Sequence, residues 1–378
     1  MTQRIKSAIY SIILFLSKKQ YSSRNKKILL VKTDEIGDYL LWRNYASYYK
    51  TCPRFKSYKI TLCGNIAWKN LFDAFDSSHF DEVIWLDKQQ FKSNMPYRYR
   101  FLRKINAEKF EIVVNTIYSR CLRIDDSIVI AADAKTNIGM PANDNNVLSF
   151  EKGYDKNLYQ QLADIPVENL FDFYRNKLFT AFATSQTIPV TPLSFDKTQL
   201  ERKTTLPENY FVVFPGSNKA DRIWPALNFK LVTEHILEKH GFHIVICGAE
   251  TDLKYAESLT QLLKIPFTDL CGKTNLKEFL KILAYAKGII SIDTGSVHLA
   301  ATVQCPVFGI FNGSQYGRFA PYPPEIFKNF FSIYPDTVEK DINNSNFEKY
   351  RYLSPVKYEE VSAKKVIDSI KIFFENRT

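Results

Sequence analysis

Residues 288–311 read GIISIDTGSVHLAATVQCPVFGIF, and this stretch decides the fold. Mainly apolar runs at 288–293 and 306–311 predict two buried strands, and residues 295–303 between them predict a helix. Strands that are apolar on both faces and separated by helices are typical of a parallel sheet covered by helices on both sides. The stretch therefore predicts an α/β fold.

The same alternation of apolar runs and helical stretches extends over most of the chain. Further strands are predicted at 27–33, 57–63, 82–87, 110–116 and 127–133, and then at 210–216, 242–248 and 267–272. A Pro- and Thr-rich stretch at 187–198, TIPVTPLSFDKT, separates the two sets and predicts a linker. We expect two α/β domains with a central cleft between them.

Composition narrows the class of protein before any motif is considered. The 378 residues are 45% hydrophobic and 24% charged, which excludes a disordered or fibrous chain. Lys and Arg number 51 against 40 Asp and Glu, and the net charge of +11 favours anionic partners: nucleic acid, phospholipid or phosphorylated small molecules. No zinc finger, basic helix or RNP-like aromatic motif occurs, so we expect no nucleic-acid partner.

Neither the cysteines nor the histidines are spaced as metal ligands. The six cysteines are scattered without a Cys-x-x-Cys pair, and the five histidines form no His-Glu-x-x-His. We therefore expect no metal site, no cofactor, and reduced thiols in a cytoplasmic protein.

The first 20 residues, MTQRIKSAIYSIILFLSKKQ, predict an amphipathic helix, because apolar residues recur at helical spacing between basic ones. The apolar stripe comprises Ile5, Ala8, Ile9, Ile12, Ile13 and Leu16, and the flanking cations are Arg4, Lys6, Lys18 and Lys19. The apolar run is too short to span a bilayer. Two interpretations stay open: a helix in the headgroup region of an anionic membrane, or a helix packed on the protein's own surface.

The loop after the first predicted strand reads KTDEIGDYLL at 32–41. Its Gly37-Asp38 pair is expected to place a carboxylate at the start of a helix running to about Lys50, at the sheet edge where open α/β folds bind ligands. Asp38 could serve there as a general base, or it could only stabilise the helix through the dipole. The loop contains no Gly-x-Gly-x-x-Gly, which disfavours a dinucleotide-dependent oxidoreductase.

Three loops in the second half have the composition of a nucleotide-diphosphate site. The first pairs a Gly-Ser turn with two cations, which suits a diphosphate. The second offers an acid either to ribose hydroxyls or to a helix cap, and the third opens a helix whose free amides can bind phosphate. The candidate residues are Ser217, Asn218, Lys219 and Arg222 in the first loop, Glu250 or Asp252 in the second, and Asp293, Thr294, Gly295 and His298 in the third.

Four segments, in this order, resemble glycosyltransferase family 9, the lipopolysaccharide heptosyltransferase-like enzymes. They are Ile36-Gly37-Asp38, Pro215-Gly216-Ser217 with Arg222-Ile223-Trp224-Pro225, the stretch 272–278, and Asp293-Thr294-Gly295-Ser296-Val297-His298. The resemblance implies a GT-B architecture of two Rossmann-like domains. It implies an acceptor domain at 26–190, a nucleotide-sugar domain at 199–340, and a final segment at 341–378 whose helix crosses back to the first domain. Residues 1–25 stand outside this pattern as an amphipathic extension.

The resemblance also implies a function, namely inverting and metal-independent transfer of a sugar to a lipopolysaccharide core or related glycan, with heptose from ADP-heptose as the expected donor. Asp38 matches the family's proposed general base, and the three loops of the second half match its donor site. The absence of Asp-x-Asp agrees with metal independence. Candidates for contact with an anionic, lipid-linked or core oligosaccharide acceptor are Arg43, Arg120 and Arg123. Such an enzyme is expected in the cytoplasm, with peripheral membrane contact left open.

The chain departs from the family pattern in three places. Arg222 stands where the family usually has Lys, residues 311–315 read FNGSQ where it tends to have Phe-Gly-Pro-Thr-Asp, and some 25 residues precede the first strand. These departures leave open a hexose donor in the same fold, and an oxidoreductase as the weaker alternative. The accepting hydroxyl, the linkage and the oligomeric state are equally open.

Overall fold

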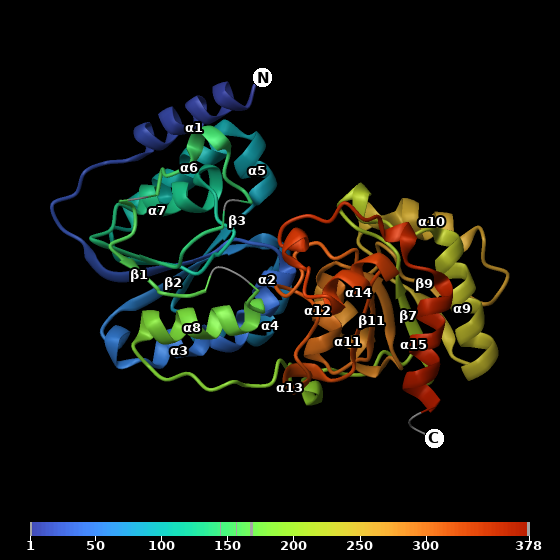
Figure 1. Ribbon diagram of the computed structural model, residues 1–378. Coiled ribbons are helices and arrows are strands. Elements are labelled where there is room, and N and C mark those ends of the chain that lie inside the picture. Colours follow the sequence, from blue (N-terminus) through green and yellow to red (C-terminus); the bar gives the residue numbers. More distant parts are fainter. Residues whose placement is uncertain (1, 144, 156, 167–168, 376–378) are drawn as a thin grey trace. The chain divides into compact units, whose positions relative to one another are not determined.

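The chain forms two compact units, Met1–Val190 and Thr191–Thr378. The computed structural model describes residues 2–143, 145–155, 157–166 and 169–375 (Figure 1). The division falls inside the Pro- and Thr-rich stretch at 187–198, most of which has no regular secondary structure.

The first unit is built on a six-stranded sheet in which all neighbouring strands are parallel. Its strands are β1 (Asn25–Lys32), β2 (Lys59–Asn65), β3 (Glu82–Leu86), β4 (Phe110–Asn115), β5 (Thr136–Gly139) and β6 (Gln161–Leu162). Their order across the sheet is β3-β2-β1-β4-β5-β6, which is the Rossmann order. The order reverses between β1 and β4, so ligand-binding loops are expected after these two strands.

Helices cover both faces of this sheet, with α1, α5, α6 and α7 on one side and α3, α4 and α8 on the other (Figure 1). Their bounds are α1 (Gln3–Ser17), α2 (Ile36–Leu40), α3 (Ala46–Thr51), α4 (Lys69–Phe75), α5 (Lys88–Ser93), α6 (Met95–Ala107), α7 (Ser127–Ala132) and α8 (Asp172–Thr184). The helix expected from Asp38 to Lys50 is in fact interrupted: α2 and α3 are separated by a short 3-10 turn at Arg43–Tyr45.

The strand predicted at 127–133 is wrong, because these residues form α7. Ile128, Val129, Ala131 and Ala132 are all buried, so the segment is apolar on every side. A short, continuous apolar run does not distinguish a buried helix from a buried strand. The fifth strand of the sheet comes later, at Thr136–Gly139.

The second unit contains another six-stranded parallel sheet. Its strands are β7 (Tyr210–Phe214), β8 (His243–Ile246), β9 (Phe267–Asp269), β10 (Ile289–Ile292), β11 (Val307–Ile310) and β12 (Phe330–Ile333). The order β12-β11-β10-β7-β8-β9 repeats the Rossmann order of the first unit, with the switch point between β7 and β10.

The helices of the second unit are α9 (Ala226–His240), α10 (Leu253–Thr260), α11 (Leu276–Tyr285), α12 (Gly295–Thr302), α13 (Pro324–Phe327), α14 (Asp336–Asn343) and α15 (Ala363–Glu375). Among the helices in the described ranges of the whole chain, none has the length and apolar character needed to cross a membrane. The sequence analysis did not anticipate β12, α13 or α14.

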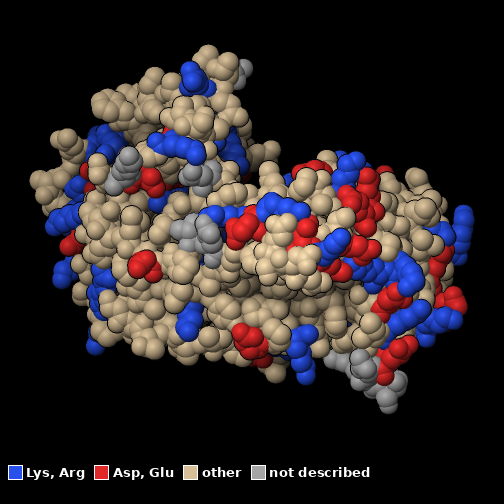
Figure 2. All heavy atoms as spheres, in the orientation of Figure 1, with Lys and Arg blue, Asp and Glu red and all other residues tan. Residues whose placement is uncertain are grey.

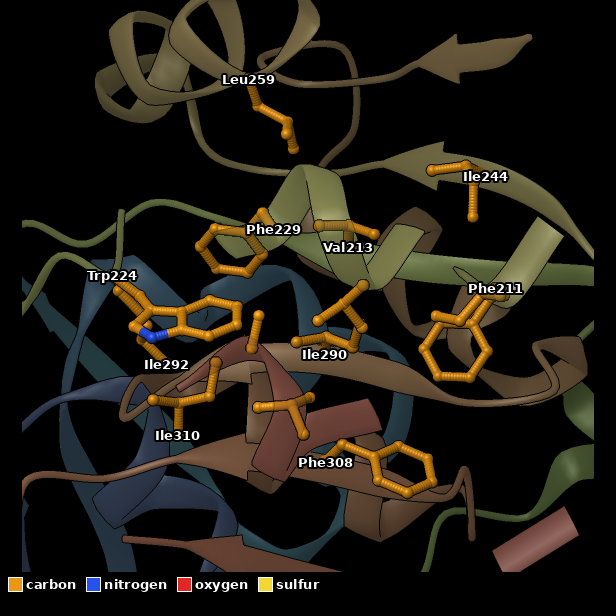
Figure 3. Close-up of a cluster of buried hydrophobic side chains, with 14 of the residues drawn as sticks. Phe211, Val213, Trp224, Phe229, Ile244, Leu259, Ile290, Ile292, Phe308 and Ile310 are labelled. Atoms are coloured by element: carbon orange, nitrogen blue, oxygen red, sulfur yellow. The ribbon is translucent and has the colours of Figure 1, made fainter. Parts of the chain in front are cut away.

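One face of the second sheet forms a continuous hydrophobic core (Figure 3). Val213, Ile290 and Ile310, from three adjacent strands, belong to the same buried cluster as Trp224, which lies in the loop after β7. The indole of Trp224 packs edge-on against Phe229 of α9, with ring centroids 4.8 Å apart. This core anchors the loop that carries Arg222.

The last helix, α15, belongs to the same core. Its residues Val366, Ile370 and Phe373 are buried in the cluster that contains Trp224, and Trp224 Nε1 donates a hydrogen bond to Val361 O at 2.8 Å. We expected this helix to cross back to the first domain. Its apolar stripe is buried against α9, β11 and β12 of the second unit, and the crossing itself stays a prediction.

Candidate functional site

In the second unit, the loops that follow β7 and β10 are joined by an ion pair. Arg222 Nη1 lies 3.1 Å from Asp293 Oδ2 and 3.3 Å from Asp293 O. Asp293 is buried directly after β10, whereas the Arg222 side chain is 20% exposed. Burial raises the pKa of the Asp293 carboxyl, and the positive charge of Arg222 opposes that rise. The pair fixes a guanidinium at the switch point of the sheet.

The position of Arg222 follows from its neighbour two residues on. Trp224 is fully buried in the core, and its indole N–H bonds to Val361 O, so the chain just after Arg222 cannot move freely. Among the side-chain nitrogens of Arg222, only Nη1 makes hydrogen bonds to the part of the chain that the structure describes. The N–H groups of Nε and Nη2 can therefore donate hydrogen bonds to a ligand. A guanidinium can bind two phosphate oxygens at once.

The Gly-Ser turn after β7 is shaped by contact with the loop after β8. A Cβ atom on Gly216 would lie 2.3 Å from Cγ of Asp252, so only glycine fits there. Ser217 is buried and its Oγ accepts a hydrogen bond from Lys219 N at 3.1 Å, while the Asn218 and Lys219 side chains are exposed. The turn thus presents Asn218 and Lys219 outward beside Arg222.

Of the two acids predicted to meet ribose, Asp252 is engaged in the fold. It is buried, and its Oδ2 accepts a hydrogen bond from Ala249 N at 2.9 Å in a capping box. Burial raises the pKa of Asp252. Glu250 is exposed at the same turn. The contacts of Asp252 are therefore those of a helix cap, which was one of its two interpretations. Glu250 is the acid that a ligand can reach.

The turn after β10 leads directly into α12, whose N-cap is Thr294. Thr294 Oγ1 and Ser291 Oγ lie 2.7 Å and 2.6 Å from Ser296 Oγ, so three hydroxyls form one cluster. The first amides of a helix have no intrahelical partner, and the helix dipole favours an anion there. Gly295 is only half-buried at this end and leaves these amides accessible.

His298 lies one turn into α12 and is buried. Its Nδ1 shares a hydrogen bond of 2.6 Å with the hydroxyl of Tyr322, a partner that the sequence analysis missed. The bond holds the imidazole ring in one orientation. The fold thus positions His298, which lies close in sequence to the turn that leads into α12.

In the first unit, the carboxylates of Asp34 and Asp38 lie at the switch point after β1. Asp38 is half-buried in the first turn of α2. Asp34 Oδ2 accepts a hydrogen bond from the buried Lys32 Nζ at 3.0 Å, and Oδ1 is buried without a hydrogen-bond partner among the described residues. Asn65 Nδ2 and Trp68 Nε1 both donate to Asp34 O, at 3.1 and 3.3 Å, and so fix the turn.

Burial raises the pKa of Asp34 to about 7, the charge of Lys32 opposes this rise, and that of Asp38 adds to it. The sequence analysis quoted Asp34 within its loop but gave it no role. The available signal was its place immediately after a buried strand, three residues before the Gly-Asp pair. Because Asp38 contributes to the rise, the two carboxyl groups must be close enough for their charges to interact.

The three arginines expected to bind an acceptor are engaged within the first unit. Arg43 forms a bidentate ion pair with Asp76, in which Nε and Nη2 lie 2.9 and 2.7 Å from the two carboxylate oxygens of Asp76. Arg120 is buried and donates to Asp126, Asp155 and Met140 O. Arg123 lies 3.7 Å from Glu151 and bonds to Gln3 at 3.4 Å. Each of these arginines is thus paired with a nearby acid, and its contact with an acceptor stays a prediction.

Among the residues that the structure describes, no three His, Cys, Asp or Glu side chains are grouped as they would be around a metal ion. All six cysteines are buried and unpaired.

Comparison with known proteins supports the same family over most of the chain. Residues 98–348 match the family model of glycosyltransferase family 9 (heptosyltransferase). Lipopolysaccharide core heptosyltransferase OpsX of Haemophilus influenzae is 28% identical over 139 residues, which is 36% of this chain and 39% of that protein. Lipopolysaccharide heptosyltransferase 3 of Escherichia coli is 19% identical over 266 residues, 68% of this chain and 75% of that one. The segment that matches OpsX covers less than half of the length of OpsX.

Solved structures give the fold. E. coli heptosyltransferase WaaC with ADP superposes with a TM-score of 0.68 at 16% identity, covering 93% of this chain and 100% of that one. The family 9 glycosyl transferase of Veillonella parvula gives 0.66 at 16% identity, covering 93% and 98%. These neighbours have the GT-B fold, and the two six-stranded Rossmann-like sheets identify it here. With the family model matching well over half of its length, the chain belongs to glycosyltransferase family 9.

Proposed function

We propose that this protein transfers a sugar, with inversion and without a metal ion, from a nucleotide-diphosphate donor to a lipopolysaccharide core or related glycan. The expected donor is ADP-heptose. The observation that carries the proposal is the Arg222–Asp293 pair, which holds a guanidinium across the switch point next to the start of α12. Family membership and the ADP named in the WaaC structure agree with it.

On the donor side, the diphosphate would contact Arg222, Lys219 and the first amides of α12. Asp293 would position Arg222 rather than touch the ligand, because a carboxylate beside a diphosphate is repulsive. The hydroxyl of Thr294 and the half-buried Gly295 would complete the phosphate contacts, and Ser217 and Asn218 would line the turn. These groups act as the charge grows on the leaving diphosphate, which is when their stabilisation accelerates the reaction.

Glu250 would accept hydrogen bonds from the two ribose hydroxyls, since it is the exposed acid at the end of β8. His298, oriented through Tyr322, would address the sugar or the phosphate nearest to it.

On the acceptor side, Asp38 would act as the general base. The acceptor oxygen forms a bond to the anomeric carbon, its proton passes to the Asp38 carboxylate, and the bond from the anomeric carbon to the phosphate oxygen breaks to release the nucleoside diphosphate. Asp34, whose pKa is raised to about 7, lies close enough to interact with Asp38.

Donor identity is the finer part of the proposal, and a hexose donor is the second candidate. The turn 311–315, which departs from the family pattern, is bonded to a later segment: Asn312 Nδ2 donates to Val356 O at 2.9 Å, and Ser354 N donates to Ser314 Oγ at 2.9 Å. A turn with different hydrogen bonds after β11 could change the sugar that fits. We place the reaction in the cytoplasm, with the acceptor carried on lipid.

The proposal is tested by incubating the protein with truncated lipopolysaccharide and a panel of ADP-, UDP- and GDP-sugars, and then weighing the glycan. We expect a gain of one heptose from ADP-heptose, and no gain with the Asp38→Asn variant. A gain of one hexose instead would favour the second candidate. No gain from any sugar, with a protein that still binds ADP, would contradict glycosyl transfer to this acceptor class.

A further inference from the structure

Helix α1 turns its larger apolar residues away from the protein. Ile5, Ile12, Phe15 and Leu16 are 52%, 59%, 79% and 58% exposed. Because Ile5, Ile12 and Leu16 are spaced by seven and four residues, they form one stripe, with Phe15 at its margin. An ordinary surface helix buries such a stripe in the core. We call these four residues the outer face of α1.

The opposite face of α1 attaches the helix to the first unit through polar contacts and through Ile13 and Leu14, which pack against the core. Ser7 is buried and its Oγ donates to Glu151 Oε1 at 2.8 Å, and the Tyr10 hydroxyl donates to Lys92 O. The Arg98 guanidinium of α6 lies 3.9 Å from the centre of the Tyr10 ring. Just after the helix, Lys19 N donates to Asn106 Oδ1 at 2.8 Å. The helix is therefore held at both ends with its outer face outward.

Positive charge surrounds this apolar face. Arg4 and Lys6 lie near the start of α1, Lys18 and Lys19 follow its end, and the first 33 residues contain no Asp or Glu. The neighbouring helices α5 and α6 add further Lys and Arg and also lack acids. In Figure 2, blue and tan atoms cover the region where α1 lies in Figure 1. An acid does occur near the end of α1, where Lys18 pairs with Asp133 at 2.9 Å.

We propose that the outer face of α1 binds a membrane surface rich in anionic phospholipid, with Ile5, Ile12, Phe15 and Leu16 among the upper acyl chains and the cations among the phosphates. An apolar stripe bordered by Lys and Arg is the pattern of a helix lying in the plane of a bilayer. A second copy of this chain would also cover apolar residues, but it would bring two sets of like charges together. The charge thus favours lipid over self-association.

The proposal separates the two interpretations that the sequence left open: α1 is packed on the protein by one face and has a second face for a membrane. It does not rest on sugar transfer, because binding is measured without donor or acceptor. A failure of either proposal therefore leaves the other standing.

The test uses the full chain and sucrose-loaded vesicles, either of phosphatidylcholine alone or of phosphatidylcholine with one quarter phosphatidylglycerol. The test variant is Ile12→Glu with Phe15→Glu, which changes only exposed side chains. The matched control is Ile372→Glu on α15, because Ile372 is also a helical isoleucine and is 57% exposed. Thermal unfolding of all three proteins, and light scattering without vesicles, accompany the sedimentation.

We expect the wild type and the Ile372→Glu control to sediment with anionic vesicles and only weakly with neutral ones. The double variant should bind at least tenfold less with an unchanged Tm. Three outcomes would overturn the proposal: no binding of the wild type to anionic vesicles, equal loss in the control, or a wild-type dimer that the double variant abolishes. The last would assign the outer face to a second copy of the chain.

Discussion

The two sheets share one strand order but differ in the charge that they present at the switch point. In the first unit, the turn after β1 presents the carboxyl groups of Asp34 and Asp38. In the second, the turns after β7 and β10 present Arg222 and the start of α12. The same topology thus creates a place for a ligand twice, and the loop residues determine which ligand suits it.

The way each unit fixes its charged group also differs. Arg222 is paired with one carboxylate and keeps donors free, so that its charge remains available to an anion. Asp34 is half-buried beside the buried Lys32, and desolvation raises the pKa of its carboxyl to about 7. The second unit therefore holds a permanent positive charge, whereas the first holds a proton that can be exchanged near neutral pH. Four predictions test this difference, in order of decreasing expected effect.

The largest effect is expected from Asp38→Asn. Losing a general base should lower kcat by about 10²–10⁴-fold, while the affinity for ADP stays the same because the diphosphate contacts lie in the other unit. The measurement is steady-state transfer together with an ADP titration. Asp73→Asn on α4, an exposed acid in the same unit, is the control and should behave like the wild type. Wild-type turnover of the Asp38 variant would remove this residue from catalysis.

Next in size is Trp224→Phe. The variant loses the indole hydrogen bond to Val361 O and part of a buried ring, which should lower the free energy of unfolding by about 2 kcal/mol. ADP affinity should fall as well, because the loop that positions Arg222 is loosened. The control is Trp85→Phe on β3 of the first unit, which should change stability alone. Equal ADP affinity in both variants would break the proposed link between Trp224 and Arg222.

A smaller effect is expected from Arg222→Gln. Removing a charge-assisted contact to phosphate should weaken ADP binding by about 10–100-fold, measured by calorimetry. Arg202→Gln, which replaces an exposed arginine of the same unit, should leave ADP binding unchanged. If both variants bind ADP equally well, the diphosphate is held elsewhere.

The smallest effect, taken per pH unit, is a pH dependence of stability that depends on Asp34. When folded, Asp34 keeps its proton up to about pH 7, whereas its ordinary pKa is 3.8, so the folded state binds more protons between these values. Its stabilisation is present in acid and is lost as the pH rises, by at most about 1.4 kcal/mol per pH unit. Relative to the wild type, Asp34→Asn should therefore gain unfolding free energy from pH 4.5 to 7.5. A difference that is constant over this range would contradict the raised pKa.

Much of this molecule was predictable from its sequence. Buried strands such as Ile289–Ile292 are apolar on both faces, and the turns after them contain Asp, Thr and Gly, so both the sheet and the family resemblance could be recognised. The run at 127–133 was predicted wrongly because burial on every side removes the periodicity that distinguishes helix from strand. Arginines such as Arg43 looked available because their partners, here Asp76, are distant in sequence. The role of Asp34 depends on burial and on Lys32, which only the fold reveals.

The division of roles between the two sheets is tested most directly by hydrogen–deuterium exchange of the wild-type protein with and without ADP. If the second unit binds the diphosphate, ADP should slow the exchange of amides at 215–222 and 293–298. The exchange rates of amides at 33–41 should stay unchanged. Protection confined to 33–41, with 215–222 and 293–298 unaffected, would contradict the account.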